Sequence, residues 1–364
     1  MALSKVNPNF VSQNLGRRNL IINGDMRVAQ RGTSFTLADG AVTFPVDRFF
    51  IQDTNSASGV ATISQSTTAP TNFKNSLKID VTTADAALVA ADQYKIEHRI
   101  EGQDIKRLNY GTSSARTVTL SFYIRSNKTG NTQVALINSA NDRGYIAAFT
   151  IDSTNTWERK ELTIPGAPDG TWLDDNQTGI RLRWGSFGSN YQTSTLNQWI
   201  STGYVSQPNS RSDSPINFFD STDNELYLTG VQMEVGSTAT DFEHRSYAEE
   251  LAACERYFQK FGGTAYATIA SGMQPNTTNA KFHLSYRQEM RTAPAITVST
   301  AVADLIVTDR TAFDQVISGL SGNVAGRTSA YLSAQYSAVG ATGRGILLAV
   351  KNGTTTTLNL DAEL

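Results

Sequence analysis

The hydrophobic pattern of the chain changes period between residues 226 and 261, and this change constrains the fold more than any other sequence feature. In the first half, apolar residues almost alternate with polar ones, as on a half-buried strand, with one slip at 229–230 that predicts a bulge. The apolar residues of this run are Leu226, Leu228, Val231, Met233 and Val235. Gly236 ends the predicted strand.

The second half of the stretch has the spacing of a helix. Ser246 and Glu249 have the form of a capping box, which predicts where the helix begins. Apolar residues then recur at helical intervals: Tyr247, Leu251, Cys254, Phe258 and Phe261. A closing strand followed by the chain's one convincing helix predicts a boundary between two domains. The five apolar side chains would form a domain or subunit interface, although the pattern also fits a helix packed on its own domain.

Most of the remaining chain has the pattern of short strands. Gly, Ser, Thr and Asn are abundant and helix formers are sparse, so the fold class is mainly β. Before residue 243, strands are predicted at 19–25, 60–65, 76–81, 94–100, 118–124, 133–137, 145–151, 157–164 and 179–184, with a further apolar group at 44–51. Strands without intervening helices indicate a two-sheet sandwich or jelly roll. We expect 118–124 and 133–137 to be adjacent antiparallel partners, because a short turn joins them.

Four segments follow from this pattern. Residues 1–18 are polar and irregular and are interpreted as an N-terminal docking arm, followed by a jelly-roll sandwich at 19–243. A connecting helix is predicted at 244–261 and a smaller C-terminal β domain at 262–364. The strands predicted for that domain are 281–286, 295–299, 304–307, 329–334 and 345–350.

Charge and composition exclude several classes of function. The chain has 31 Lys and Arg residues against 33 Asp and Glu residues, so it lacks the basic excess of nucleic-acid-binding proteins. No stretch approaches the roughly 18 apolar residues that span a bilayer, and no basic leader joins an apolar run. We therefore expect neither membrane insertion nor an export signal. Cys254 is the only cysteine, which rules out an intramolecular disulfide and fits synthesis in a reducing cytoplasm.

The sequence carries no catalytic signature. The three histidines have no metal-ligand spacing, and there is no P-loop, dinucleotide fingerprint or nucleophile elbow. We accordingly predict no catalytic residue, no metal site and no cofactor. Two acidic groups could supply the carboxylate pair of a glycosidase but are interpreted as solvated surface: Asp174 with Asp175, and Asp220 with Asp223 and Glu225. Asn23, Asp25 and Asp241 could hold a structural calcium, yet turn formation and capping are favoured.

Aromatic residues in polar loops are the best candidates for a binding site, because flat rings stack on sugar faces. Trp157 and Trp184 lie within strand patterns and are predicted to be core. Trp172 lies in a loop with acids and amides, and Trp199 lies in a long polar region at 185–223. The candidate glycan-binding residues are Trp172, Asp174, Asn176, Tyr191 and Trp199. Either tryptophan could instead plug one end of a sandwich.

Several motifs resemble those of structural proteins of tailed bacteriophages. The motifs are residues 14–34, which include Asn-Leu-Ile-Ile-Asn-Gly-Asp, then 47–49, 100–102, 229–243 and 254–258. Such proteins are described as tail-fibre or minor structural proteins with a carbohydrate-binding-module-like domain. The resemblance is dense over about residues 14–260, includes the closing 360–364, and is weak over the rest of the C-terminal domain. Within the wider carbohydrate-module superfamily, 19–25 and 229–235 resemble the first and last strands, but the motifs place no sugar-binding aromatic residue.

Together these observations predict a non-enzymatic component of a bacteriophage virion, assembled in the bacterial host cytoplasm. We expect a tail fibre or tail-associated protein that contributes to attachment to a host-surface polysaccharide. The expected partners are other virion proteins of the tail or head and further copies of the chain, because an apolar helix stripe could pack about a threefold axis as a homotrimer. The alternatives are a capsid or tail decoration or adaptor protein without a ligand, and a polysaccharide depolymerase.

Overall fold

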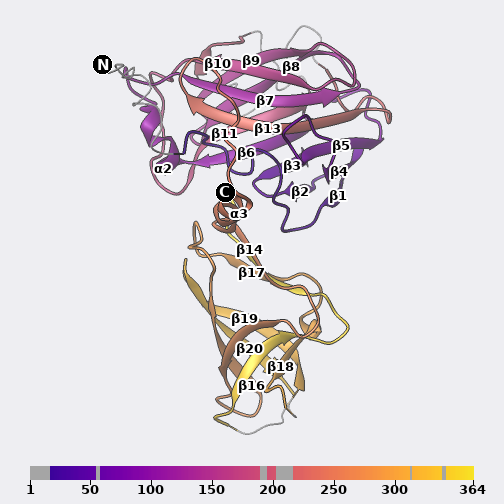
Figure 1. Cartoon of the computed structure of the whole chain (residues 1–364), viewed down its shortest axis with the longest axis vertical. Helices are drawn as coiled ribbons and strands as arrows, with labels where there is room; N and C mark the ends of the chain where they lie inside the picture. The colour runs from indigo at the N-terminus through magenta and orange to yellow at the C-terminus, as the bar shows by residue number, and fades with distance from the viewer. Residues whose placement is uncertain (1–16, 55–57, 189–194, 202–215, 312–313, 338–341) are drawn as a thin grey trace, which may run out of the picture. The chain divides into compact units, whose positions relative to one another are not determined.

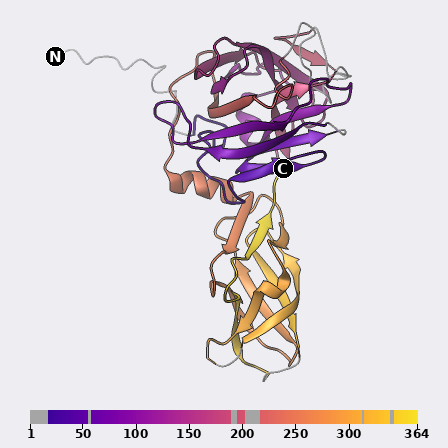
Figure 2. The ribbon, with the colours of Figure 1, turned by 90° about the vertical axis from the view of Figure 1, so that its right-hand side faces the viewer.

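The computed structural model describes residues 17–54, 58–188, 195–201, 216–311, 314–337 and 342–364. Contacts divide the chain into two compact units, Met1–Ser246 and Tyr247–Leu364. Both units consist mainly of antiparallel strands, so the mainly β class with a smaller C-terminal β domain is confirmed (Figure 1, Figure 2). The division after Ser246 assigns the helix that follows to the second unit, whereas the sequence predicted a separate connector at 244–261.

The first unit is a jelly-roll β-sandwich of two sheets. Among the described residues, a six-stranded sheet has the spatial order β1 (Ser34–Leu37), β4 (Val60–Ser66), β5 (Ser76–Thr83), β13 (Glu225–Val235), β7 (Val118–Ser126), β10 (Glu158–Ile164). The described part of the other sheet has seven strands in the order β12 (Trp199–Ser201), β9 (Arg143–Ile151), β8 (Gly130–Asn138), β11 (Thr178–Phe187), β6 (Gln93–Glu101), β3 (Phe49–Thr54), β2 (Val42–Val46). Two short helical turns, α2 (Gly102–Ile105) and η1 (Lys106–Leu108), follow β6.

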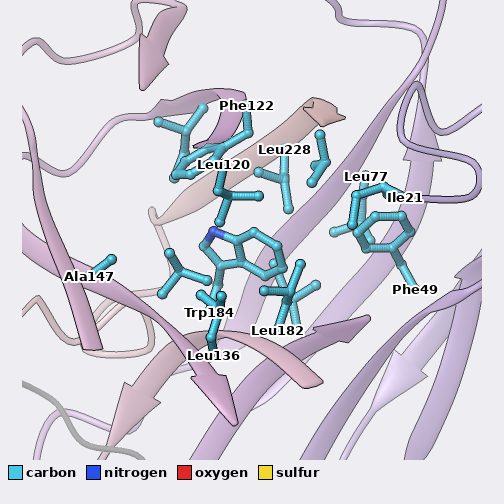
Figure 3. Packing of buried hydrophobic residues seen from close by; sticks show 14 of the residues in the cluster. Ile21, Phe49, Leu77, Leu120, Phe122, Leu136, Ala147, Leu182, Trp184 and Leu228 are labelled. Carbon is cyan, nitrogen blue, oxygen red and sulfur yellow. The ribbon is translucent and has the colours of Figure 1, made fainter. Parts of the chain in front are cut away.

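Alternating side chains of the two sheets form one shared hydrophobic core. Figure 3 shows Trp184 of β11 directed toward Leu120 of β7, with Leu136 and Leu182 close by. The prediction that Trp184 is a core residue is confirmed by its burial. Trp157, however, precedes β10, is only partly buried and packs edge-on against the ring of Tyr227 at 6.1 Å. Its prediction as a core residue was therefore wrong.

The prediction of a strand at 19–25 was also wrong. The backbone amide of Leu20 donates to the carbonyl of Met233, but the side chain of Asn19 makes the neighbouring bonds that a paired strand would make with its backbone. Asn19 Oδ1 accepts from the amides of Ile21 and Met233 at 2.9 and 3.0 Å, and its Nδ2 donates to the carbonyl of Val231. Asparagine side chains compete with backbone ladders in this way, so the segment lies beside β13 without joining its sheet.

The bulge predicted at 229–230 is present. The register of β13 against β7 shifts between Thr229 and Gln232, and Gly230 has a φ of 62°. A Cβ at Gly230 would lie 2.8 Å from the ring of Phe73. A glycine is therefore needed both for the backbone conformation and for the close approach of the aromatic ring.

Segments 118–124 and 133–137 form strands β7 and β8, but they are not partners. β7 pairs with β10 and β13, while β8 pairs with β9 and β11 in the other sheet. The connection between them crosses from one sheet to the other. The turn residues in this connection could not indicate that the second strand changes layers.

The predicted helix is correct only in its first half. Helix α3 begins at Tyr247, directly after Ser246 as the capping signature predicted, and ends at Glu255. Phe258 and Phe261 belong instead to strand β14 (Phe258–Gly262), which pairs with β22 (Thr357–Asp361). These two aromatic residues have helical spacing, but aromatic residues also have a high propensity for strands. They form a strand here because the segment pairs with β22 near the end of the chain.

The second unit contains a closed barrel and a small sheet. The described barrel strands run in the order β15 (Thr268–Met273), β16 (Asn279–Ser285), β20 (Ser329–Tyr336), β19 (Asp314–Ala325), β18 (Leu305–Thr308), β21 (Gly345–Val350), with η3 (Val302–Asp304) before β18. The sheet has the order β14, β22, β17 (Ala295–Val298). The five strands predicted here are confirmed as β16, β17, β18, β20 and β21. No helix within the described residues is long and apolar enough to cross a membrane.

Candidate functional site

Trp172 and Trp199, predicted from separate loops, lie together at one edge of the sandwich. Trp199 is in the edge strand β12 opposite Tyr145, and Trp172 is in the loop between β10 and β11. Their ring centres are 5.8 Å apart at an angle of 89°, and the ring of Tyr110 contacts them at 4.8 and 5.7 Å. We call Tyr110, Tyr145, Trp172 and Trp199 the aromatic cluster. The structure thus brings the two predicted tryptophans into one group.

The aromatic cluster is mainly a plug for the core. The indole nitrogen of Trp172 donates to the carbonyl of Asp169 at 2.9 Å, and that of Trp199 donates to the carbonyl of Pro165 at 2.7 Å. Both rings are partly buried against the sandwich core, and burial raises the pKa of the Tyr110 phenol. Both indole donors are used by the chain itself, and only the exposed part of each ring is available to a ligand.

A pocket of about 190 Å³ opens beside Trp172. Its walls include Lys106, Asn109, Tyr110 and Asp174. Lys106 Nζ lies 2.9 Å from Asp174 Oδ2, and this bond holds the pKa of the Asp174 carboxyl below its usual value. Asp174 and Trp172, both named as candidate glycan-binding residues, therefore line the same pocket. Asn176 is not among the residues that line this pocket, and Tyr191 lies outside the described residues.

A second polar surface lies on β6 and β11, on the face of the seven-stranded sheet opposite to the core. Alternate residues of these strands point into the core, so those between them share the outward face. In the register of the pair, Arg181 lies directly opposite Arg99, and Arg183 lies opposite Glu97. Lys95 continues this row. We call Lys95, Glu97, Arg99, Arg181 and Arg183 the cationic cluster.

The only carboxylate of the cationic cluster, Glu97, is fully buried and lies between two arginines. Its Oε1 is 2.5 Å from Arg99 Nε, and its Oε2 pairs with Arg183 Nε. Burial would raise the pKa of Glu97, but the attraction of Arg183 and Arg99 outweighs burial and lowers it. The carboxylate is therefore held ionised and is shared by both guanidinium groups.

The pKa values of Lys95 and Arg181 reflect their burial and the cations beside them. Lys95 is only 8% exposed, and burial together with repulsion from Arg183 lowers its pKa to about 8. Burial and repulsion from Arg183 also lower the pKa of Arg181 to about 10. Arg99 keeps 28% of its side chain exposed, and its guanidinium lies 4.8 Å from the ring centre of Phe50.

Sequence reasoning missed the cationic cluster. Arg181 and Arg183 alternate with apolar residues, which predicted a strand with one polar face. That these residues face Arg99 and Glu97 follows only from the pairing of β6 with β11, whose segments are far apart in the sequence. The available signal was the same alternation of charged and apolar residues in β6.

Three of the five acids weighed for a hydrolytic pair form ion pairs with lysines. Asp174 pairs with Lys106, Asp220 pairs with Lys128, and Glu225 lies 2.6 Å from Lys78. The hydrogen bond from Lys78 lowers the pKa of Glu225, as that from Lys106 does for Asp174. A general acid at neutral pH needs a raised pKa, so neither carboxyl is tuned for that role.

The residues weighed for calcium are used in the first turn of the sandwich. Asn23 Nδ2 donates to the carbonyls of Val28 and Asp47 at 2.9 and 2.8 Å, and Asp25 pairs with Arg27. These bonds correspond to the turn-forming interpretation of Asn23 and Asp25. In the part of the chain that the structure describes, no three His, Cys, Asp or Glu side chains form a group that could hold a metal ion.

The five residues predicted as an interface differ in exposure. Tyr247 is 53% exposed and Leu251 is partly exposed, whereas Cys254 and Phe258 are buried within the single chain. Phe261 is partly buried beneath the guanidinium of Arg287, which lies 4.6 Å from its ring centre. The residues do not form one helical stripe, because the last two lie in β14. A role for them between domains or subunits remains a prediction.

No family model and no curated protein matches the chain. Similar solved structures include the enzymatically active domain of tailspike protein 4 of bacteriophage CBA120, with 10% identity, a TM-score of 0.29, and coverage of 60% of this chain and 21% of the tailspike chain. A family 11 carbohydrate-binding module of Clostridium thermocellum has 11% identity, a TM-score of 0.28, and coverage of 58% and 98%. The xylan-binding domain CBM22-1 of Paenibacillus barcinonensis has 10% identity, a TM-score of 0.27, and coverage of 61% and 96%. The chain thus spans about a fifth of the tailspike chain. Similarities this distant carry no functional assignment.

Proposed function

We propose that the chain is a non-enzymatic structural component of a bacteriophage virion, a tail fibre or tail-associated protein that contributes to attachment to a host-surface glycan. The cationic cluster on the outward face of the seven-stranded sheet carries the attachment part of this proposal. The sequence motifs at 14–34, 229–243 and 254–258, which resemble those of phage structural proteins, support the virion part.

The cationic cluster has the physical properties of a polar recognition surface. Its guanidinium groups are planar donors, which suit hydroxyl and acid oxygens of sugars, and Phe50 adds an apolar ring beside Arg99. All members stand on strands of a sandwich, so the donors are held in place before a ligand arrives. Burial and repulsion from Arg183 lower the pKa values of Lys95 and Arg181, so keeping these two groups charged costs stability, and a bound ligand would offset that cost.

A glycan array tests the attachment part of the proposal. The purified chain should give a signal with at least one bacterial surface polysaccharide, and it should release no reducing ends from that polysaccharide. Release of reducing ends would show that the chain is a depolymerase. Gold-labelled antibodies to the chain should bind particles of the encoding phage, and their absence from every particle would contradict the virion part.

A decoration or adaptor protein without a ligand is the second candidate. The observation that favours it is the use of both indole donors of Trp172 and Trp199 by backbone carbonyls of the same chain. Indole donors that bond to backbone carbonyls of the same chain are not available to the hydroxyl groups of a sugar. The array separates the two candidates, because a decoration protein would bind none of the glycans while still labelling the particle.

The proposal includes assembly as a homotrimer with docking through residues 1–18. Tyr247 leaves an exposed ring on α3, which is the part of the predicted interface that a second copy could reach. Residues 1–16 lie outside the described residues, while Arg18 is tied to the sandwich by the bond from its amide to Glu243 Oε1 at 3.1 Å. Mass measurement in solution tests the trimer, and a monomer at high protein concentration would exclude it.

A further inference from the structure

We infer that the pocket lined by Tyr266, Arg310, Thr311 and Asp314 binds one neutral sugar unit. The pocket belongs to the second unit, whereas the cationic cluster belongs to the first. The inference therefore goes beyond the proposed function and does not depend on the cationic cluster.

The pocket is formed by two turns of the barrel. Tyr266 lies in the loop before β15, Arg310 and Thr311 follow β18, and Asp314 is the first residue of β19. The volume of the pocket is about 240 Å³. Pockets for drug-sized ligands begin at roughly 300 Å³, so this pocket suits a single sugar unit better than a long stretch of polysaccharide.

Backbone strain is the first argument for a ligand. Tyr266 and Arg310 have φ values of 60° and 63°, in the left-handed region that bulky side chains rarely adopt. Six of the ten described non-glycine residues with positive φ are asparagines, which tolerate this conformation, and Tyr266 and Arg310 are the two that lie in the second unit. Strained residues of this kind cluster at ligand-binding sites. Here both of them line one pocket.

The two strained residues also contact each other. The guanidinium of Arg310 lies 5.6 Å from the ring centre of Tyr266, and its Nη2 donates to the carbonyl of the same residue. Nη2 also donates to Thr268 Oγ1 at 3.1 Å. These contacts fix the position of the guanidinium, while Tyr266 remains 43% exposed. The aromatic ring therefore offers an apolar surface to a ligand.

The turn after β18 is held by its own side chains. Thr308 Oγ1 accepts from the amide of Arg310 at 2.9 Å. Asp309 Oδ1 accepts from the amide and the hydroxyl of Thr311 at 2.9 and 2.8 Å, and Asp309 Oδ2 pairs with Arg344 at 2.9 Å. The hydroxyl proton of Thr311 is thus used by Asp309, and its oxygen can accept from a ligand. The polar groups of this turn are therefore in place before binding.

The charges of the pocket indicate the class of the ligand. Within the described residues, Arg310 donates only to neutral oxygens, and Asp314 makes no ion pair. An acidic ligand would meet the carboxylate of Asp314, and a cationic ligand would meet the guanidinium of Arg310. A neutral sugar matches both groups, because its hydroxyl groups accept from a guanidinium and donate to a carboxylate. Its apolar ring face can pack on Tyr266.

Saturation-transfer NMR with the full chain tests the inference, because this method detects weak binding. The neutral probes are the methyl glycosides of glucose, galactose, mannose and N-acetylglucosamine. Methyl glucuronide and methyl glucosaminide are the acidic and basic comparisons. We expect at least one neutral glycoside to bind. The two charged sugars should bind at least about fivefold more weakly than it, because each places a like charge beside Asp314 or Arg310.

Substitutions locate the binding. Tyr266→Ala should weaken binding of the neutral glycoside at least about fivefold, and Asp314→Asn should weaken it about tenfold, through lost ring contact and a lost charge-assisted hydrogen bond. Tyr331→Ala is the matched control and should leave binding unchanged. Tyr331 is 42% exposed in β20 of the same unit, and Lys281 Nζ lies 5.6 Å from its ring centre, the same distance as between Arg310 and Tyr266.

Calorimetric unfolding separates binding from a packing role of Tyr266. Tyr266→Asn should lose binding as Tyr266→Ala does, with little change in the unfolding temperature, because asparagine tolerates positive φ. A large fall in the unfolding temperature with unchanged binding would assign the ring to packing and overturn the inference. Where neither variant folds, Asp314→Asn decides, because Asp314 is exposed.

The outcomes also separate this inference from the proposed function. Binding of none of the neutral glycosides, or tighter binding of a charged one, would overturn the inference and leave the proposed function standing. Binding that Arg181→Gln removes and Tyr266→Ala leaves intact would assign the sugar to the cationic cluster, which supports the proposed function and overturns the inference. Binding that Tyr266→Ala removes, with no polysaccharide bound on the array, would support the inference and contradict the attachment function.

Discussion

Asp53 provides the most direct test of the electrostatics of the sandwich. It lies near the end of β3 opposite Tyr94, is fully buried, and neither of its carboxylate oxygens has a hydrogen-bond partner among the described residues. Burial, followed by repulsion from Asp39, Asp92 and Asp85, raises its pKa from 3.8 to about 7. We predict that Asp53→Asn stabilises the first unit at alkaline pH, because the amide removes the cost of ionisation.

The size of the effect follows from linkage between protonation and folding. The pKa is raised in the folded state, so the unfolded chain ionises first and wild-type stability falls as the pH rises from about 4 to about 7. A difference of about three pH units, at about 1.4 kcal/mol each, gives an upper value of about 4 kcal/mol. Relaxation around the charge reduces this, and we expect Asp53→Asn to gain about 2–4 kcal/mol at about pH 8. The gain should fall to nearly zero at about pH 2–3, below the unfolded-state pKa of 3.8, where the wild-type carboxyl is mainly neutral in both states.

Urea unfolding followed by tryptophan fluorescence measures the stability of the first unit, because all four tryptophans lie before Ser246. Asp175→Asn is the control, since Asp175 is exposed and its loss should leave the pH dependence unchanged. A gain from Asp53→Asn that is the same at acidic and alkaline pH would refute the argument from ionisation. Selective stabilisation of the wild type by added calcium would refute it too, because Asp53 would then serve a cation.

Three further predictions concern packing and assembly. Trp172→Ala should lower the free energy of unfolding of the first unit by about 2 kcal/mol, measured by urea unfolding. The loss is smaller than for a fully buried tryptophan because the ring is only half-buried. Unchanged stability together with lost glycan binding would show that Trp172 contacts the ligand instead. Gly230→Ala should cost about 1–3 kcal/mol in the same assay through its positive φ and the contact with Phe73, and a neutral effect would contradict the need for glycine. Tyr247→Glu should lower the mass of the assembly in solution. Tyr331→Glu is the control and should not lower it, because Tyr331 in β20 has a similarly exposed ring outside the predicted interface. Equal effects of the two substitutions would place the interface elsewhere.

Local patterns of the sequence predicted most strands of the sandwich because each buried face imposes a period of two. The slip at 229–230 even located the bulge beside Phe73, since a bulge shifts the pattern by one residue. The same reasoning failed at 19–25, where the apolar run has strand character but the side chain of Asn19 replaces the ladder bonds. It failed again at Phe258 and Phe261, where helical spacing and strand propensity coincide and the partner strand lies near the end of the chain.

The candidate sites also differ in how far local sequence could predict them. The sequence could single out Trp172 and Trp199 as aromatic residues in polar segments. It could not show that their indole nitrogens donate to backbone carbonyls of the same chain, which is what indicates a packing role. The cationic cluster could be predicted even less, because only the pairing of β6 with β11 shows that Arg181 lies opposite Arg99. A lone arginine on a strand is an ordinary solvated residue, whereas Arg99 and Arg181 face each other beside the buried Glu97, an arrangement that only the strand pairing shows. Long-range register, which a single sequence does not encode locally, therefore decides which charged side chains of β6 and β11 lie together.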